Sequence, residues 1–343
     1  MRPSRIGIML ASAFVLVATL TGPSVAREPV SSSSTGVARV FFPNPVASLQ
    51  DQSLTDRKDA DYPAIQPAYV EVTLTNLDGS GYLRGDWANI RGSTGPLAYS
   101  PDDVFLYDRT DDRFEQVMAY YWVTQAQLYV QSLGFGTTYP PVNMESQDIR
   151  INQYGVDNSY SWDKHDVLRF GKGGVDDAED AEVILHEYGH AIQDSQMTPF
   201  GGFGTSEEAG AIGEGFGDYW AVTVSAVVAP TPDPACVADW DSVSYTTSTP
   251  HCLRRVDGDL IYPDDLNGRV HHDGQIWSRA LWDIRVALGN VEADTIILDA
   301  QFSFAPDTSM PAAAAATVDT AQALYGNSAA NAVTAAFVAR GIL

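Results

Sequence analysis

The pentapeptide His186-Glu187-Tyr188-Gly189-His190 constrains this chain more than any other feature of its sequence. Positions four apart lie on one face of an α-helix, so both imidazoles can bind the same metal ion if the segment is helical. Apolar residues flank the motif at 183–185 and 191–192, which is typical of a helix packed into a core. We therefore predict a helix over residues 178–194 whose two histidines bind one zinc ion.

Glu187 lies at the adjoining edge of this helix, where its carboxylate can take a proton from a zinc-bound water. A catalytic zinc also needs a third protein ligand and one open coordination position. Gln193 and Gln196 stand where the metzincin peptidases carry Gly and His, which excludes that class. The alternative is a carboxylate on the next helix, predicted over residues 207–227, and Glu214 is the candidate.

Glu207 and Glu208 compete with Glu214, but acidic residues at the start of a helix are expected for electrostatic reasons alone. Asp218 follows on the face of Glu214, where it can accept a hydrogen bond from the second ring nitrogen of a ligating histidine. Glycine costs about 1 kcal/mol relative to Ala inside a helix, so the glycines of this helix predict a close approach to the metal helix. They are Gly210, Gly213, Gly215 and Gly217.

Two adjacent histidines, His271 and His272, stand in the segment 267–274. Hydrolysis of a peptide bond builds negative charge on the carbonyl oxygen, and an imidazole aimed at that oxygen would stabilise it. Either histidine can be that donor. The alternative is that both belong to a solvated helix N-terminus without a catalytic role.

The N-terminus and the charge balance indicate where such a protein works. Residues 1–26 read as a signal peptide, because two arginines precede an apolar run and Ser24-Val25-Ala26 offers a cleavage site. We therefore expect a secreted or periplasmic protein. Its 44 acidic and 20 basic residues give a formal charge of -24, which argues against nucleic acid or membrane partners because both would repel it. We expect a monomer that acts on peptides or proteins.

Cys236 and Cys252 are the only cysteines. An even pair in an exported chain predicts a disulfide, and two unpaired thiols are the alternative. The remaining pattern is β-rich over residues 27–104 and mostly helical in a catalytic domain over 105–343, with further helices within 272–340. This order predicts an α+β fold of two lobes with the zinc site in the cleft between them.

With these motifs in place, the chain resembles the thermolysin-like zinc peptidases, and within them the fungalysin-like branch. The resemblance rests on Asp180–Asp194 around the HExxH motif, Ala209–Asp218, Val270–His271, Gly274–Trp277 and Leu281–Asp283. It implies that His186, His190 and Glu214 are the zinc ligands. It further implies that Glu187 is the base, that Asp218 orients a ligand, and that His271 rather than His272 is the transition-state donor.

The resemblance has two further implications. The family places an edge strand for the substrate backbone upstream of the metal helix, which assigns Asn158 and Ser159 to substrate binding, with an ordinary polar turn as the alternative. Related enzymes hold calcium near an acidic segment like 176–182. A calcium ion is therefore one hypothesis for this segment, and a helix N-terminus that favours acids is the other.

The sequence thus predicts a secreted zinc endopeptidase in which Glu187 activates the water. Two rivals remain. A zinc exopeptidase would share the metal site but needs a pocket for a free chain terminus. A non-catalytic module that holds zinc only for binding is the rival from a different functional class.

Overall fold

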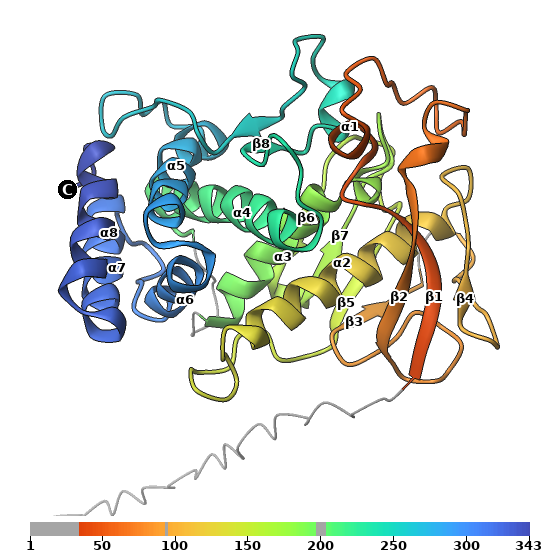
Figure 1. Cartoon of the computed structure of the whole chain (residues 1–343), viewed down its shortest axis with the longest axis horizontal. Coiled ribbons are helices and arrows are strands. Elements are labelled where there is room, and N and C mark those ends of the chain that lie inside the picture. Colours follow the sequence, from red (N-terminus) through yellow and green to blue (C-terminus); the bar gives the residue numbers. More distant parts are fainter. Residues whose placement is uncertain (1–33, 93–94, 197–203) are drawn as a thin grey trace, which may run out of the picture.

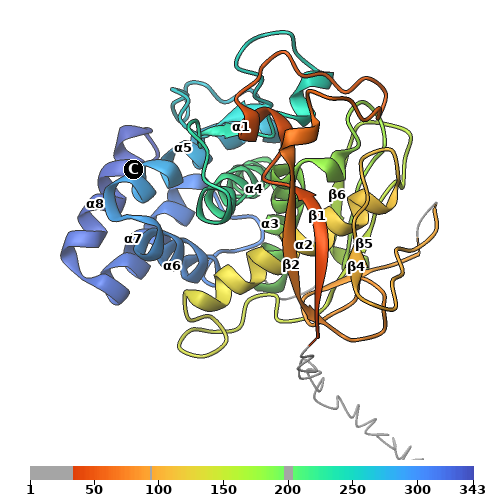
Figure 2. The ribbon, with the colours of Figure 1, turned by 45° about the vertical axis from the view of Figure 1, so that its right-hand side comes forward.

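The computed structural model describes residues 34–92, 95–196 and 204–343, so the predicted signal peptide lies outside the described residues. The chain has the predicted α+β architecture. Figure 1 shows the N-terminal sheet at one end of the molecule and the C-terminal helices at the other, and the two remain on opposite sides in Figure 2. The helices that carry the zinc motif lie between the two ends.

The N-terminal sheet has the strand order β2-β1-β4. Strands β1 (Ser34–Phe41) and β2 (Tyr69–Leu77) pair in an antiparallel register with Val40 opposite Val70, and β4 (Val104–Phe105) joins β1 in parallel. Buried side chains alternate with less buried ones along β1 until its end, as expected for a strand with one face on the core. A short helix, α1 (Pro45–Leu49), follows β1.

The second sheet has the order β3-β5-β7-β6. Its strands β3 (Ala88–Ile90), β5 (Gln147–Arg150) and β7 (Val167–Arg169) are parallel. Strand β6 (Tyr160–Trp162) pairs antiparallel with β7 and forms one edge of the sheet. The predicted substrate-binding residues therefore directly precede an edge strand.

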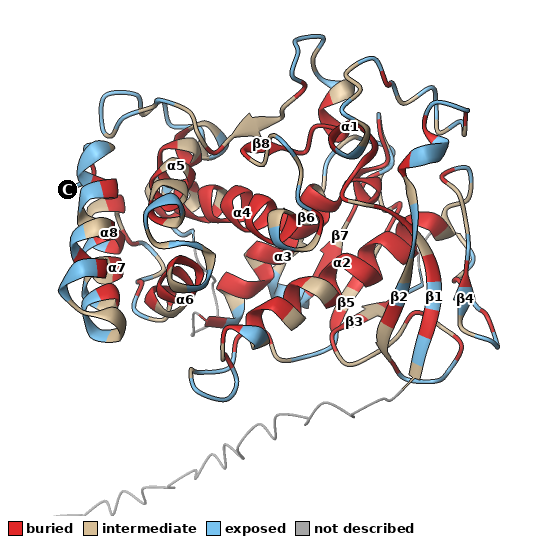
Figure 3. Cartoon of the chain, in the orientation of Figure 1, coloured by how far each residue is buried: buried red, intermediate tan, exposed pale blue. Residues whose placement is uncertain are grey.

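Three helices form the centre of the molecule. Helix α2 (Arg113–Ser132) is buried along most of its length, and Figure 3 shows it almost entirely in the colour of buried residues. Helix α3 (Ala181–Gln196) carries the HExxH motif and α4 (Glu207–Val228) follows it. Helix α3 begins three residues later than predicted, because Asp180 has an extended backbone and its Oδ1 accepts the Glu182 amide at 2.9 Å.

The C-terminal half adds α5 (Val270–Leu288), α6 (Asn290–Gln301), α7 (Met310–Tyr325) and α8 (Asn327–Ala339). The sequence pattern did not distinguish α6 as a separate helix. Its buried positions include the polar residues Asp294 and Thr295, which obscure the apolar periodicity. Asp294 is buried because it accepts hydrogen bonds from Tyr129 and Tyr219 and contacts Arg285.

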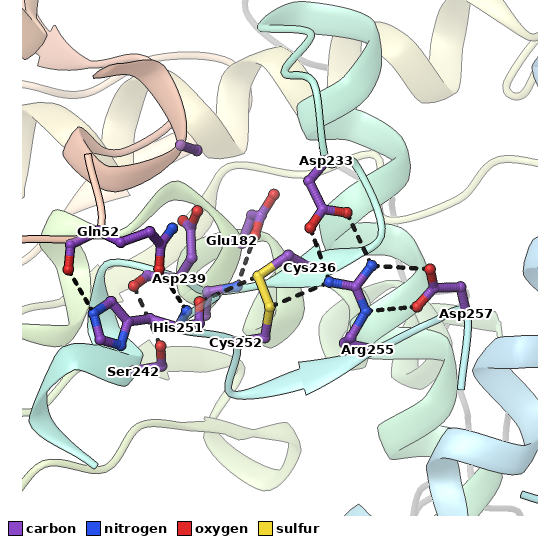
Figure 4. Close-up of a disulfide and its surroundings, with 12 residues drawn as sticks. Gln52, Glu182, Asp233, Cys236, Asp239, Ser242, His251, Cys252, Arg255 and Asp257 are labelled. Atoms are coloured by element: carbon purple, nitrogen blue, oxygen red, sulfur yellow. Dashed lines mark hydrogen bonds and ion pairs between the residues drawn. A yellow bond between two sulfur atoms is a disulfide. The ribbon is translucent and has the colours of Figure 1, made fainter. Parts of the chain in front are cut away.

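The segment between α4 and α5 carries the cysteines. Strands β8 (Cys236–Val237) and β9 (Arg254–Arg255) pair antiparallel, and the predicted Cys236–Cys252 disulfide is present, with Cα atoms 5.2 Å apart. Figure 4 shows Arg255 beside this disulfide, between Asp233 and Asp257. His251 of this segment is buried and bonds to Gln52 through its backbone amide and its ring.

Among the described residues, no helix is both long enough and apolar enough to span a lipid bilayer.

Candidate metal centre

The three predicted zinc ligands come together from two helices. His186 and His190 lie one turn apart on α3, and Glu214 reaches them from α4. The Nε2 atoms of the two histidines are 3.2 Å apart, and Glu214 oxygens lie 3.2 Å from His186 Nε2 and 3.9 Å from His190 Nε2. Ligands at about 2.0–2.2 Å from a tetrahedral zinc lie roughly 3.3–3.6 Å apart. The donor set and its spacing therefore fit one zinc ion.

Asp218 orients the first ligand. Its Oδ1 lies 2.9 Å from His186 Nδ1, which leaves Nε2 directed at the metal position. Burial alone would lower the pKa of His186, but the hydrogen bonds and charges of Asp218 and Glu214 raise it to about 10. A metal ion that binds Nε2 must displace the proton that this pKa implies. His190 differs, because burial lowers its pKa to about 4.

Arg254 also contacts Asp218, and the sequence did not predict it as part of the site. Its Nε and Nη2 atoms lie 2.6 and 2.7 Å from the two carboxylate oxygens of Asp218. Burial alone would raise the pKa of Asp218, but Arg254 holds it well below the usual range. The only available signal was an arginine two residues after Cys252, in a segment that has no periodicity to predict its place.

Glu187 points into the same site without serving as a ligand in this group. Its side chain is buried, its Oε2 accepts no hydrogen bond, and the backbone N–H of Ser161 in β6 donates to the carboxylate. Burial raises the pKa of Glu187 to about 7. A carboxylate with a pKa near neutrality suits a group that takes up and releases a proton at neutral pH.

The two candidate histidines on α5 have different environments. His271 Nε2 lies 3.2 Å from Glu214 Oε2, and its side chain remains 61% exposed. His272 instead contacts Asp273 at 3.0 Å. Asp273 also accepts the backbone amides of Asn267 and Gly268, which fixes the turn that leads to His271. The structure thus brings His271, and not His272, to the ligands.

The predicted substrate-binding residues border a cavity beside the metal position. Asn158 and Ser159 line this space of about 220 Å³ together with His186 and Glu187. Arg254 and His271 are also part of its lining. The cavity therefore adjoins both a predicted zinc ligand and the predicted base.

Glycines set the distance between the helices. A Cβ atom at Gly217 would lie 2.8 Å from the Nδ1 and Cε1 atoms of His186, so only glycine leaves room for that ring. The predicted close approach to α3 therefore holds for Gly217. Gly215 and Gly210 face α5 instead, where Cβ atoms would lie 2.3 Å from Gly274 O and 2.9 Å from Val270 Cγ1.

The five acids of the segment 176–182 lie directly before α3 or in its first turn, and all of them are buried. Asp180 accepts the backbone amides of Trp240 and Asp241, each at 3.1 Å. Glu182 accepts that of Ala238 at 2.7 Å, and Glu179 pairs with Arg109 at 2.8 Å. Figure 4 shows Glu182 and Asp239 beside the disulfide. These acids attach the cysteine-containing segment to the start of α3.

Comparison with known proteins is consistent with this arrangement. A family model described as fungalysin metallopeptidase (M36) matches residues 152–342. A solved structure described as the precursor of protealysin, a metalloproteinase from Serratia proteamaculans, superposes with a TM-score of 0.54 at 18% sequence identity. That likeness covers 67% of this chain and 79% of the other, and it concerns the fold. No curated protein matches the chain.

Proposed function

This chain belongs to the fungalysin metallopeptidase family, and from that premise we propose that it is a zinc endopeptidase whose reacting groups are those of the α3–α4 site. The observation that carries the proposal is the convergence of His186, His190 and Glu214 at zinc-ligand spacing beside a buried Glu187. A bound zinc ion would supply Lewis acidity and lower the pKa of a water towards neutrality.

The roles of the protein groups follow from their positions. Glu187, with a pKa raised to about 7, takes a proton from the attacking water and then delivers it to the leaving amine. His271 donates a hydrogen bond to the carbonyl oxygen as negative charge develops there. Asp218, held by Arg254, keeps His186 in the tautomer that leaves Nε2 free for the metal.

The substrate is a peptide or protein, and β6 is positioned to bind its backbone. An extended peptide pairs with an exposed sheet edge through main-chain hydrogen bonds. Asn158 and Ser159 then contact the substrate where it enters the cavity. We also propose that the chain is exported after cleavage near Ala26, which N-terminal sequencing of the secreted protein would test.

The decisive experiment is digestion of denatured casein by the zinc-loaded protein, with and without a zinc chelator, beside Glu187→Gln. We expect internal fragments from the wild type and loss of activity in both other cases. Trimming from one terminus alone would favour the exopeptidase. Binding of casein without cleavage by well-folded, zinc-loaded wild type would favour the non-catalytic module and contradict the proposal.

Calcium is a separate hypothesis that the structure narrows. Asp180, Glu182 and Glu179 already bond to backbone amides or to Arg109. Asp177 belongs to a group with Asp157 and Asp241, and Asp176 to a group with Asp112 and Glu115; in each group the oxygens lie within 4.8 Å of one another. Calcium is therefore a candidate occupant of either group, and a chelator that lowers the melting temperature without removing zinc would support it.

A further inference from the structure

The cavity beside Glu187 has a second set of acidic groups in its wall. Besides His186 and Glu187, its lining includes Asp177, Asp241 and Tyr245. Asp177 comes from the turn before α3, and Asp241 from the cysteine-containing segment. A side chain of a bound peptide next to the scissile bond would enter this space, because the proposed base and a proposed ligand lie in the same wall.

The carboxylates of Asp177 and Asp241 lack an opposite charge. They are 3% and 4% exposed, and the Oδ1 atom of each has no hydrogen-bond partner. Asp157 lies with them, so that three carboxylates have oxygens within 4.8 Å of one another. Burial raises the pKa of Asp177 to about 7 and also raises that of Asp241. Unpaired buried carboxylates are unfavourable, and a cation placed between them would remove that penalty.

Among the residues that the structure describes, none in the cavity wall supplies this cation. Arg254 lines the same space, but its guanidinium is bonded to Asp218 through two contacts. The groups nearest to the three aspartates are other carboxylates and neutral hydroxyls, among them Ser159 and Tyr245. A cationic group of a ligand would supply the missing charge.

The hydrogen bonds favour an N–H donor over a metal ion as that ligand. The hydroxyl of Ser159 donates to Asp177 Oδ2, and that of Tyr245 donates to Asp157 Oδ1 at 2.6 Å. Each of these oxygens already accepts one hydrogen bond, and calcium needs six to eight oxygen ligands. The free Oδ1 atoms of Asp177 and Asp241 suit the several N–H donors of an ammonium or guanidinium group.

We propose that this cavity receives the side chain of a lysine or arginine next to the scissile bond, and that Asp177 and Asp241 determine this specificity. The inference rests on the proposed function, because it assigns the substrate class of the same site. It separates this chain from a peptidase that selects apolar side chains, since an apolar group would leave both carboxylates buried and unpaired.

The first test is the cleavage profile of the zinc-loaded wild type on a library of unstructured peptides, read by mass spectrometry. We expect Lys and Arg to be enriched on one side of the cleaved bonds. Enrichment of Leu or Phe there would overturn the inference and leave the proposed function standing. No cleavage of any peptide would instead contradict the proposed function. This profile requires no variant, so it does not depend on how a mutant folds.

The second test compares two peptides that differ only by Lys or Leu at the selected position. In Asp177→Asn and Asp241→Asn, we expect the ratio of kcat/KM for Lys over Leu to fall about tenfold or more, with zinc content retained. Asp233→Asn is the matched control, because Asp233 pairs with Arg255 outside this cavity. An unchanged ratio in both variants would overturn the assignment. A second result would also overturn it: calcium raises the melting temperature of the wild type but not of Asp241→Asn, and the wild type shows no preference for Lys or Arg.

Discussion

Asp218, on α4, and Asp180, directly before α3, are both buried aspartates, but their partners differ in charge. Asp218 contacts the cation of Arg254 and the ring of His186, and its pKa is held well below the usual range. Asp180 accepts hydrogen bonds only from neutral groups, namely backbone amides and the Asn44 side chain, and burial raises its pKa. Asp218, beside the proposed metal site, thus has a charged partner, whereas Asp180, which holds the cysteine-containing segment, has neutral donors.

The comparison teaches that an acidic residue near this site cannot be assigned from its position along the helix alone. Asp218, whose partner Arg254 is a cation, orients a proposed zinc ligand, whereas Asp180, whose partners are mostly backbone amides, contributes to folding. Variants of the two regions should therefore fail in different ways. Variants at Asp218 and the metal ligands should lose zinc but stay folded. Variants at Asp180 should unfold more easily although the zinc ligands are unchanged.

The largest expected effect is that of Glu214→Ala. Removing one of three protein ligands should abolish stoichiometric zinc binding and casein cleavage, while circular dichroism stays that of the folded protein. Zinc content after dialysis, measured by atomic absorption, checks this. Glu207→Ala is the matched control on the same helix, because Glu207 is exposed in the first turn and should keep both zinc and activity. Full zinc content in Glu214→Ala would refute the ligand assignment.

A large loss of stability is expected for Asp180→Ala. The change leaves the amides of Glu182, Trp240 and Asp241 without their acceptor. Each unsatisfied buried donor costs about 1–3 kcal/mol, so the free energy of unfolding should fall by roughly 3 kcal/mol or more. Urea denaturation measures it, and Asp180→Asn, which keeps one acceptor oxygen, should lose less. Equal and small losses in both variants would contradict the role given to this carboxylate.

A smaller effect is expected for Asp218→Asn. Loss of the carboxylate should weaken zinc binding about 10–100-fold, because His186 is no longer oriented by a charged acceptor. Competition with a chromogenic zinc chelator gives this ratio. The melting temperature of the zinc-saturated variant should also fall, because the buried guanidinium of Arg254 loses its charged partner. If stability fell sharply and zinc affinity did not change, the two aspartates would not differ as described.

The smallest effect is the pH dependence of stability. Burial raises the pKa of Asp176 to about 8 and that of Glu179 to about 7, whereas carboxyl groups in an unfolded chain titrate near 4. Between about pH 4 and 8 the folded protein keeps protons that the unfolded chain has lost, so stability should fall as the pH rises. Asp218 has a lowered pKa, and its contribution is lost only as the pH falls below about 4.

Thermal unfolding at pH 5, 6, 7 and 8 tests this balance. We expect the melting temperature to decrease by a few degrees across the series, because the folded protein must release protons that its buried carboxyl groups retain. A melting temperature that rises steadily from pH 5 to pH 8 would mean that the acidic segment is ionised and paired in the folded protein.

The sequence predicted the parts of this site that depend on helix period. His186, His190 and Glu187 follow from one pentapeptide, and Glu214 and Asp218 from their spacing on a second helix. Arg254 could not be predicted, because it arrives from a segment without periodicity whose path is fixed by contacts distant in sequence. The burial of the acidic segment could not be predicted for the same reason, since its partners at 238–241 lie about 60 residues away.

The fold shows the same division. The α+β class and the disulfide were predicted correctly, because strand alternation, helical spacing and an even cysteine pair are local or compositional signals. Helix α6 was not distinguished, since Asp294 interrupts its apolar pattern and is satisfied only by residues from α2, α4 and α5. Tertiary hydrogen bonds of this kind leave no trace in a single sequence.

Gly217 limits how far this protein can be stabilised by design. Replacing helical glycines with alanine commonly raises thermal stability, because alanine restricts the unfolded chain. At position 217 the added methyl group would displace the ring of His186, so α4 would become more rigid but zinc binding would be weakened. An engineering campaign should therefore leave Gly217 unchanged and seek its gains in exposed parts of the chain away from the metal helices.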